Sequence, residues 1–126
     1  MSQDAESPAP PPAAPTTPPA VSIEEFRRLT LRVGVITHAT EHPNADRLFV
    51  LTVDVGEGTP RQLVAGIRGS YQAQELVGKH VVVVANLKAA VLRGVESQGM
   101  VLAASDGTSI TLVTPERPVP PGSSVR

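Results

Sequence analysis

A single helical segment interrupts an otherwise β-patterned chain, and this order constrains the fold more than any other feature of the sequence. Apolar residues recur at every second position over residues 30–41 and 47–55, as in strands that bury one face. A third strand is expected at 61–65, a helix at 70–77 and a continuous apolar strand at 80–85. This order predicts an all-β, five-stranded OB-fold barrel with a helix between strands three and four.

The remaining segments carry finer expectations. In the first strand Leu31, Val33, Val35 and Ala39 alternate with Arg32, Gly34, Ile36 and His38. Gly34 is expected to mark a bend or bulge, because a small barrel has to curl its strands. Further along, residues 86–98 are expected to be a connector, 99–104 a strand and Asp106-Gly107 a hairpin turn.

The chain begins with a tail of unusual composition. Residues 1–20 hold seven prolines and five alanines, and proline cannot donate a backbone hydrogen bond or continue a helix. We expect a disordered, extended tail there and one folded domain over residues 21–126. A short helix through about Leu29 should open this domain, because a capping box and a hydrophobic staple precede it, formed by Ser22 with Glu25 and by Val21 with Phe26. The later helix is expected to start near Ser70 and to end before Gly78.

Composition excludes several classes of function. The chain has no cysteine, so disulfides, thiolate metal sites and cysteine nucleophiles are excluded. Its net charge is −1, and residues 21–126 carry 11 basic against 10 acidic side chains. A nucleic-acid site would therefore have to be a local basic patch. No stretch is long and apolar enough to span a membrane and no signal peptide is recognisable, so a cytoplasmic location is expected.

Catalysis and cofactor binding have little support in the sequence. No phosphate-binding loop, nucleophile elbow or zinc-protease motif is present, so we expect neither an enzyme nor a bound cofactor. A metal site at His42 and Asp46 is not favoured, because the two residues lie on a predicted turn rather than on one face of a helix. His42 is instead expected to be a turn or rim residue.

Two segments combine small, polar and basic residues where plain connectors would need only turn formers. They are HPNADRL at 42–48 and NLKAAVLRGVESQGM at 86–100. Together they resemble the tRNA-binding domain family, an OB-fold module that occurs as free-standing dimeric proteins and at the C-terminus of bacterial methionyl-tRNA synthetases. The resemblance covers roughly residues 22–126 and implies tRNA binding without catalysis.

The resemblance also implies which residues contact tRNA. Arg47 matches a family position implicated in tRNA contact, and a guanidinium can fork two bonds to one phosphate or stack on a base. The family's S-x-G-M motif matches Ser97-Gln98-Gly99-Met100 and places Ser97 and Met100 in the tRNA site. The full predicted tRNA-binding set is Arg47, Lys88, Arg93, Ser97, Met100 and Asn86, in which Lys88 and Arg93 supply positive charge.

Several of these residues also have a structural interpretation. Arg47 could be a solvated charge at a strand end, Met100 a core residue that starts a strand, and Asn86 a partner for backbone groups. Asn44 and Asp46 are expected to hold the tight turn before Arg47 by bonding backbone amides. They would then set the angle at which Arg47 leaves the barrel.

The chain departs from its relatives within the second segment. Many relatives read N-L-K-P-x-K-L-x-G, whereas this chain has Ala89 and Val91 in place of the proline and the second lysine. We therefore expect weaker or more salt-sensitive binding than in the lysine-rich members. With one tyrosine and two phenylalanines, base stacking is limited. Recognition of folded tRNA by shape, phosphates and a few splayed bases is predicted instead.

The favoured function is therefore a non-catalytic protein that binds structured tRNA and assists an aminoacyl-tRNA synthetase. In free-standing relatives the C-terminal extension, here about residues 105–126, pairs two subunits, so a homodimer is expected. Two alternatives stay open: a dimeric chaperone-like or protein-interaction OB module, and a detached appendix that acts in trans with methionyl-tRNA synthetase. The chaperone-like relatives lack the HPNAD and S-x-G-M segments, which favours RNA.

Overall fold

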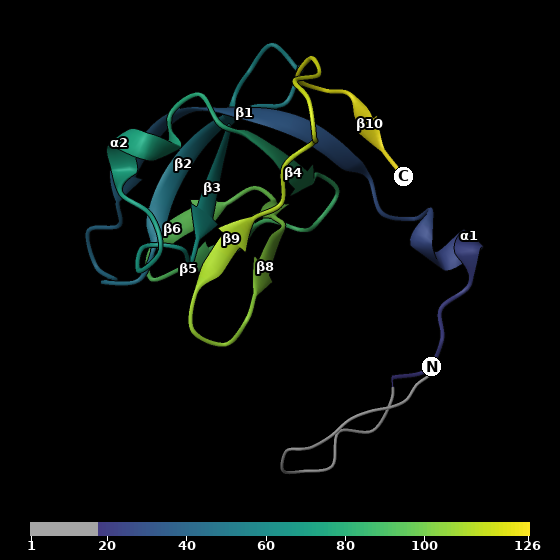
Figure 1. Ribbon diagram of the computed structural model, residues 1–126, viewed down its shortest axis with the longest axis horizontal. Coiled ribbons are helices and arrows are strands. Elements are labelled where there is room, and N and C mark those ends of the chain that lie inside the picture. The colour runs from purple at the N-terminus through teal and green to yellow at the C-terminus, as the bar shows by residue number, and fades with distance from the viewer. Residues whose placement is uncertain (1–17) are drawn as a thin grey trace.

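Five antiparallel strands form the barrel of the computed structural model, which describes residues 18–126. They lie in the order β3-β2-β1-β4-β7, with the bounds β1 (Leu31–Glu41), β2 (Phe49–Asp54), β3 (Arg61–Ala65), β4 (His80–Val84) and β7 (Met100–Val101). The helix α2 (Ala73–Leu76) comes between β3 and β4 in the chain (Figure 1). This arrangement confirms the predicted OB fold. The predicted tail lies outside the described residues, except for its last three positions, 18–20.

Aliphatic side chains fill the barrel. Phe49, Leu51 and Val53 of β2, and Val55 just after it, are all buried, as their alternation predicts. β4 is buried on both faces after His80, as its continuous apolar sequence predicts. A second, smaller cluster lies on the outer face of the β1–β4 pair, where Leu31 packs with Val82 and Val84 against partly buried Leu102 and Val125. The C-terminal end of the chain thus covers one outer face of the barrel.

Along β1 the simple alternation of the sequence breaks down. Ile36 is fully buried in the main core, although a strict alternation would place it on the same face of the strand as the exposed Arg32 and His38. The pairing with β2 shifts register between Ile36 and His38, so the bulge lies three residues beyond Gly34 and the predicted position is wrong. Gly34 instead allows Val53 of β2 to pack closely against β1, because a Cβ atom at this position would lie 2.5 Å from Val53 Cγ1.

Side chains close the barrel between β3 and the segment before β7. Ser97 Oγ accepts a hydrogen bond from the Val64 N–H at 3.0 Å, and Gln98 Oε1 accepts one from the Gln62 N–H at 2.9 Å. The Gln98 N–H donates to the Gln62 carbonyl at 2.8 Å. The outer edge of β3 is therefore occupied by the end of the second predicted binding segment.

The first helix, α1 (Ile23–Phe26), has the predicted capping box. The Glu25 N–H donates to Ser22 Oγ at 3.0 Å, and the Ser22 N–H donates to Glu25 Oε1 at 2.8 Å. The helix ends at Phe26, three residues earlier than expected, and none of its residues is buried. No helix in the described part of the chain is long and apolar enough to cross a bilayer.

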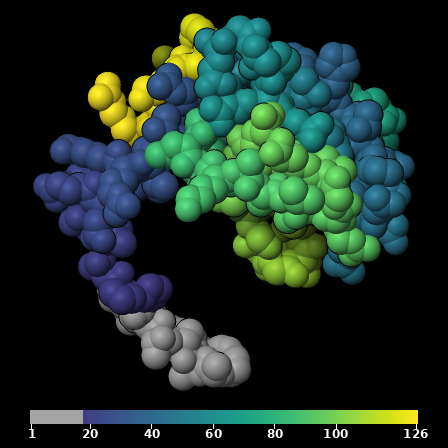
Figure 2. Space-filling model, turned by 180° about the vertical axis from the view of Figure 1, so that it is seen from behind, coloured from purple at the N-terminus to yellow at the C-terminus, as the bar shows by residue number. Residues whose placement is uncertain are grey.

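The predicted connector contains a β-hairpin. β5 (Ala90–Leu92) and β6 (Val95–Ser97) pair antiparallel around Arg93 and Gly94, whose φ angles are 54° and 90°. Two successive positive φ angles are what a tight two-residue hairpin turn of this type requires. The segment is therefore an ordered projection of the barrel rather than an irregular loop. Figure 2 shows it, in green, raised on one face of the barrel.

The C-terminal extension packs back onto the domain. The predicted strand 99–104 is split, because β7 ends at Val101 and β8 (Ala103–Ser105) pairs with β9 (Ile110–Leu112) in a separate hairpin. At its turn, hydrogen bonds from the backbone of Ser109 and Thr108 hold the pKa of Asp106 at about 2. β10 (Ser124–Val125) pairs with the beginning of β1.

The loop before α2 anchors this hairpin. Ser70 Oγ accepts the Ile110 N–H at 2.9 Å, and Tyr71 Oη accepts the Leu112 N–H at 3.0 Å. Because the Ser70 hydroxyl is used in this way, it does not cap the helix, and α2 begins at Ala73 rather than at Ser70. Gly78 follows the helix with a φ of 92°, as a residue beyond a helix end commonly does.

Candidate functional site

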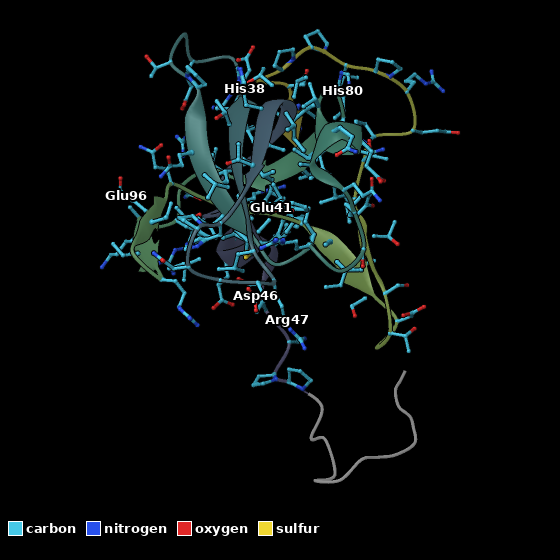
Figure 3. All side chains as sticks on the ribbon, turned by 90° about the vertical axis from the view of Figure 1, so that its left-hand side faces the viewer. His38, Glu41, Asp46, Arg47, His80 and Glu96 are labelled. Atoms are coloured by element: carbon cyan, nitrogen blue, oxygen red, sulfur yellow. The ribbon has the colours of Figure 1, made fainter. Side chains whose placement is uncertain are left out.

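The two segments singled out in the sequence meet at one end of the barrel. His42 Nε2 bonds the Leu92 carbonyl at 2.9 Å, and Arg93 Nη2 donates to the Asn44 carbonyl at 3.0 Å. Each contact joins the turn after β1 to the β5–β6 hairpin, although the segments lie about fifty residues apart in the chain. In Figure 3 Asp46 and Arg47 lie at the opposite end of the barrel from His38 and His80.

His42 is the central connection between the two segments. It is only 3% exposed, and its Nδ1 accepts the Asn44 N–H at 2.9 Å. Because Nδ1 accepts, Nε2 carries the proton and donates to Leu92. The sequence marked His42 only as a turn or rim residue. Its role could not be read from local pattern, because its partner Leu92 lies on a hairpin that the sequence did not reveal.

The turn before Arg47 is held differently from the prediction. Among the hydrogen bonds of residues 18–126, none involves the side chain of Asn44 or Asp46. Arg68 takes this role, since its Nη1 donates to the Ala45 carbonyl at 3.2 Å and its backbone N–H to the Arg47 carbonyl at 3.3 Å. Arg68 also forms an ion pair with Glu41 at 2.9 Å. The prediction for Asn44 and Asp46 is therefore wrong, because neighbouring residues already satisfy the turn.

Arg47 and Arg93 line one hollow of about 440 Å³, which we call the cationic hollow. Its other walls come from residues 44–46 and Leu48. Both arginines are exposed, and Arg93 has the left-handed φ of 54° noted above. A non-glycine residue in this conformation is uncommon and is concentrated at functional sites. The arrangement places two guanidinium groups at the surface of one end of the barrel.

Two further residues of the predicted set already form hydrogen bonds with other parts of the protein. Asn86 Oδ1 accepts the Thr30 N–H at 2.7 Å and its Nδ2 donates to the Arg28 carbonyl at 2.6 Å, which matches its structural interpretation. Ser97 is 4% exposed, and besides accepting from Val64 it donates to the Gly99 carbonyl at 2.8 Å. Both residues thus set the shape of the second segment, and direct contact of either with RNA stays a prediction.

Lys88 and Met100 lie at a second hollow of about 460 Å³, which we call the apolar hollow. It lies between β3, the second segment and the β8–β9 hairpin, and its lining includes Leu87, Leu92 and Ile110. Met100 is 47% exposed, so it is not the core residue that its position at the start of a strand would suggest. Lys88 is the one charged side chain among the residues that line this hollow.

Arg61 holds the two ends of the second segment and was not singled out in the sequence. Its Nη1 donates to the carbonyls of Ala85 at 2.6 Å and Gln98 at 2.9 Å. Its Nε and Nη2 form a two-point ion pair with Glu57 at 2.9 and 2.8 Å. The hydrogen bond from Arg61 holds the pKa of Glu57 below its ordinary value, and the same bond raises the pKa of Arg61. No local pattern marks this role, because both carbonyls are distant in the sequence.

The arrangement is suited to binding a polyanion rather than to catalysis. Arg47, Arg93 and Lys88 present positive charge along neighbouring surfaces, and guanidinium groups bind phosphates through paired hydrogen bonds. Within the described residues, no three His, Cys, Asp or Glu side chains lie together where they could hold a metal ion. The cationic hollow holds the two guanidinium groups of Arg47 and Arg93 against the one carboxylate of Asp46.

Comparison with known sequences points in the same direction. A family model described as "Putative tRNA binding domain" matches residues 31–124. The methionine–tRNA ligases of Thermococcus kodakarensis and Pyrococcus furiosus are 52% and 51% identical to the chain over 106 residues. This match covers 84% of the chain but 14% of each ligase. The chain therefore spans about one seventh of the length of these relatives.

Solved structures of three differently named proteins share the fold. A MetRS-related protein from Pyrococcus horikoshii has a TM-score of 0.79 and 32% identity, and the match covers 86% of this chain and 99% of that one. The chaperone CsaA from Bacillus anthracis has a TM-score of 0.78 and 29% identity, with coverages of 86% and 100%. The C-terminal domain of Plasmodium vivax p43 is 40% identical with a TM-score of 0.73, over 77% of this chain and 59% of that one.

Proposed function

This chain belongs to the tRNA-binding domain family, and we propose that it binds the folded shape of tRNA through phosphate contacts at its cationic hollow. It contributes no catalytic step. The proposal includes action beside methionyl-tRNA synthetase in the cytoplasm, because the ligases named above carry a similar segment. Its main support is that Arg47 and Arg93, far apart in the sequence, line one hollow at the surface.

The charge of the chain favours nucleic-acid binding at a local site over long-range attraction to the whole surface. The whole chain has a net charge of −1, so long-range attraction to nucleic acid is weak. Arg47, Arg93 and Lys88 nevertheless lie on segments tied to each other by His42 and Arg61, so the backbone positions that carry them are set before RNA arrives. A fixed set of cations matches phosphates that are held at fixed distances, as in a folded tRNA, better than those of a flexible strand.

Replacing Arg47 or Lys88 by alanine should weaken tRNA binding by about three- to tenfold, because each change removes one charge-assisted contact. Each should also lower the slope of log affinity against log salt by about one. The measurement is a gel-shift or filter-binding titration at several salt concentrations. Folded tRNA should bind more tightly than single-stranded RNA or duplex DNA of similar length.

Arg117→Ala is the matched control, because Arg117 is an exposed arginine of the C-terminal segment. It should leave both the affinity and the salt slope unchanged. Equal affinity for all three nucleic acids would reject recognition by shape. Unchanged tRNA binding in both Arg47→Ala and Lys88→Ala would move the site elsewhere on the molecule.

We also propose that two copies associate, as the sequence predicts for the C-terminal extension at about 105–126, through the side of the barrel where its last strand β10 and the helix α1 lie. Val21, Ile23, Phe26 and Leu29 expose apolar side chains there, and Figure 2 shows α1 standing clear of the barrel. Exposed apolar groups gathered in one short segment are typical of an interaction surface. A dimer would present two cationic hollows and gain affinity for one tRNA that reaches both.

Sedimentation equilibrium tests this association. The chain should sediment with twice its own mass, and Phe26→Glu should shift it towards the monomer because a charge would be buried against the partner. Val77→Glu provides the control, since Val77 is 52% exposed and follows α2. A wild-type chain that stays monomeric at high concentration would refute the dimer without affecting the RNA site.

A further inference from the structure

Arg68 and Arg61 are each paired with a carboxylate, but their guanidinium groups are held to different degrees. Arg61 donates through Nε, Nη1 and Nη2, both to the two carboxylate oxygens of Glu57 and to two backbone carbonyls. Arg68 Nη2 lies 2.9 Å from Glu41 Oε1, yet among the hydrogen bonds of residues 18–126 none joins these two side chains. Arg61 is therefore fixed by hydrogen bonds on all its nitrogens, whereas the pair of Arg68 and Glu41 is held by charge alone.

Most of the donor capacity of Arg68 is unused within the described part of the chain. A guanidinium has five N–H groups, and here the one hydrogen bond of this side chain runs from Nη1 to the Ala45 carbonyl at 3.2 Å. The side chains of Arg68 and Glu41 are 24% and 64% exposed. An ion pair in such contact with water contributes little free energy. A phosphate oxygen can therefore replace the carboxylate at low cost, while Nη1 keeps the guanidinium against the turn.

Arg68 also lies beside the cationic hollow. Its side chain bonds the Ala45 carbonyl and its backbone N–H donates to the Arg47 carbonyl at 3.3 Å, and both of these residues line the hollow. Glu41 is the last residue of β1, and Figure 3 shows it between His38 and Arg47. An RNA bound at Arg47 thus brings its phosphates close to an arginine with free donors and to a carboxylate that they repel.

We propose that Arg68 is a further phosphate contact for bound tRNA, and that Glu41 occupies its guanidinium until a phosphate displaces the carboxylate. This inference rests on the proposed function and adds to that site both a contact residue and a competing carboxylate. A phosphate favours the exchange, because it can accept two parallel N–H groups of one guanidinium, which Glu41 does not do here. Glu41 thereby lowers the affinity for any RNA that does not place a phosphate at Arg68.

Glu41→Gln tests the competition. The substitution keeps the shape of the side chain and removes the charge that pairs with Arg68. Binding of tRNA should become about two- to fivefold tighter, the range that an exposed ion pair supplies. Glu116→Gln is the matched control, because it removes the same charge from an exposed residue of the C-terminal segment, and it should bind as the wild type does. A Glu41→Gln affinity equal to that of the wild type overturns the proposal.

Arg68→Gln tests whether the phosphate is received at Arg68. By itself it should weaken tRNA binding and lower the slope of log affinity against log salt by about one. In this background the gain from Glu41→Gln should fall below about twofold, because no guanidinium is left to release. A gain of the same size in both backgrounds means that Glu41 only repels RNA, and it overturns the contact at Arg68. If both variants bind as the wild type does while Arg47→Ala weakens binding, the inference fails and the proposed function stands.

Discussion

Gly34→Val is expected to destabilise the domain by about 3 kcal/mol, the upper part of the range for overpacked cores. Even the first carbon of a side chain at Gly34 would lie 2.5 Å from Val53 Cγ1, 3.1 Å from Val55 Cγ1 and 3.3 Å from Val83 Cγ2. All three valines are buried in the main core, so none can move aside without disturbing others. Because a domain has only about 5–15 kcal/mol of stability, the variant should unfold at much lower urea concentration.

Gly69→Val is the matched control for this measurement. No atom lies within 4 Å of the place that a Cβ atom would take at Gly69, and the residue is exposed. Its urea midpoint should stay close to that of the wild type. A Gly34→Val midpoint equal to the control would mean that β1 and β2 are farther apart than the structure places them.

His42→Ala is expected to cost about 2–3 kcal/mol of stability and to weaken tRNA binding at least about tenfold. The substitution removes a side chain that is 3% exposed and leaves the Asn44 N–H and the Leu92 carbonyl without their partner in a part-buried contact. Backbone groups shielded from water are costly when they lack a partner. Binding should fall further than one lost contact would explain, because the turn that carries Arg47 is no longer tied to the hairpin that carries Arg93.

His42→Asn separates the two functions of this side chain. An asparagine oxygen can accept the Asn44 N–H two residues on, as in an Asx turn, but the side chain is too short to reach Leu92. This variant should therefore recover part of the stability and little of the affinity. His38→Ala is the control, since His38 is exposed and lies at the other end of the barrel (Figure 3). If His42→Ala were to lose stability while its tRNA affinity stayed at the wild-type value, the tie between the two segments would not matter for binding.

Local patterns in the sequence predicted those parts of the fold that depend on neighbouring residues. The alternation along β2 and the capping box at Ser22 and Glu25 are of this kind, and the structure confirms both. The hairpin turn at Asp106 and Gly107 is another, since the Asp106 carboxylate accepts the backbone N–H groups of Thr108 and Ser109. In the capping box and the turn the partner groups lie within three residues.

Features that depend on distant residues could not be read in the same way. The bulge in β1 is set by its register with β2, and a glycine in the sequence does not show on which side of it the register shifts. The β5–β6 hairpin turns at Arg93 and Gly94, and an arginine with positive φ is not a residue that predicts such a turn. Ser70 does not cap α2 as expected, because its hydroxyl accepts a hydrogen bond from the backbone N–H of Ile110, forty residues away.

In the candidate site, too, some residues could be identified from local sequence and others depend on distant partners. Resemblance of two short segments to known relatives was enough to indicate Arg47, Lys88 and Arg93. It was not enough to reveal the roles of His42 and Arg61. His42 bonds Leu92, fifty residues away. Arg61 bonds Ala85 and Gln98, which lie twenty-four and thirty-seven residues away. The sequence could therefore indicate which charged residues to test, and their contact with RNA stays a prediction. It could not indicate the residues that hold their segments in place.

The positions of the two ends of the described chain determine how such a domain can be joined to a larger protein. α1 leads into Leu31, and Val125 of β10 pairs with the same residue. The turn that carries Arg47 begins at the other end of β1, after eleven residues, or roughly 35 Å along an extended strand. A covalent neighbour joined at either end of the described residues, 18 or 126, would thus be attached away from Arg47 and Arg93. Such fusions should leave that end of the barrel free to engage RNA.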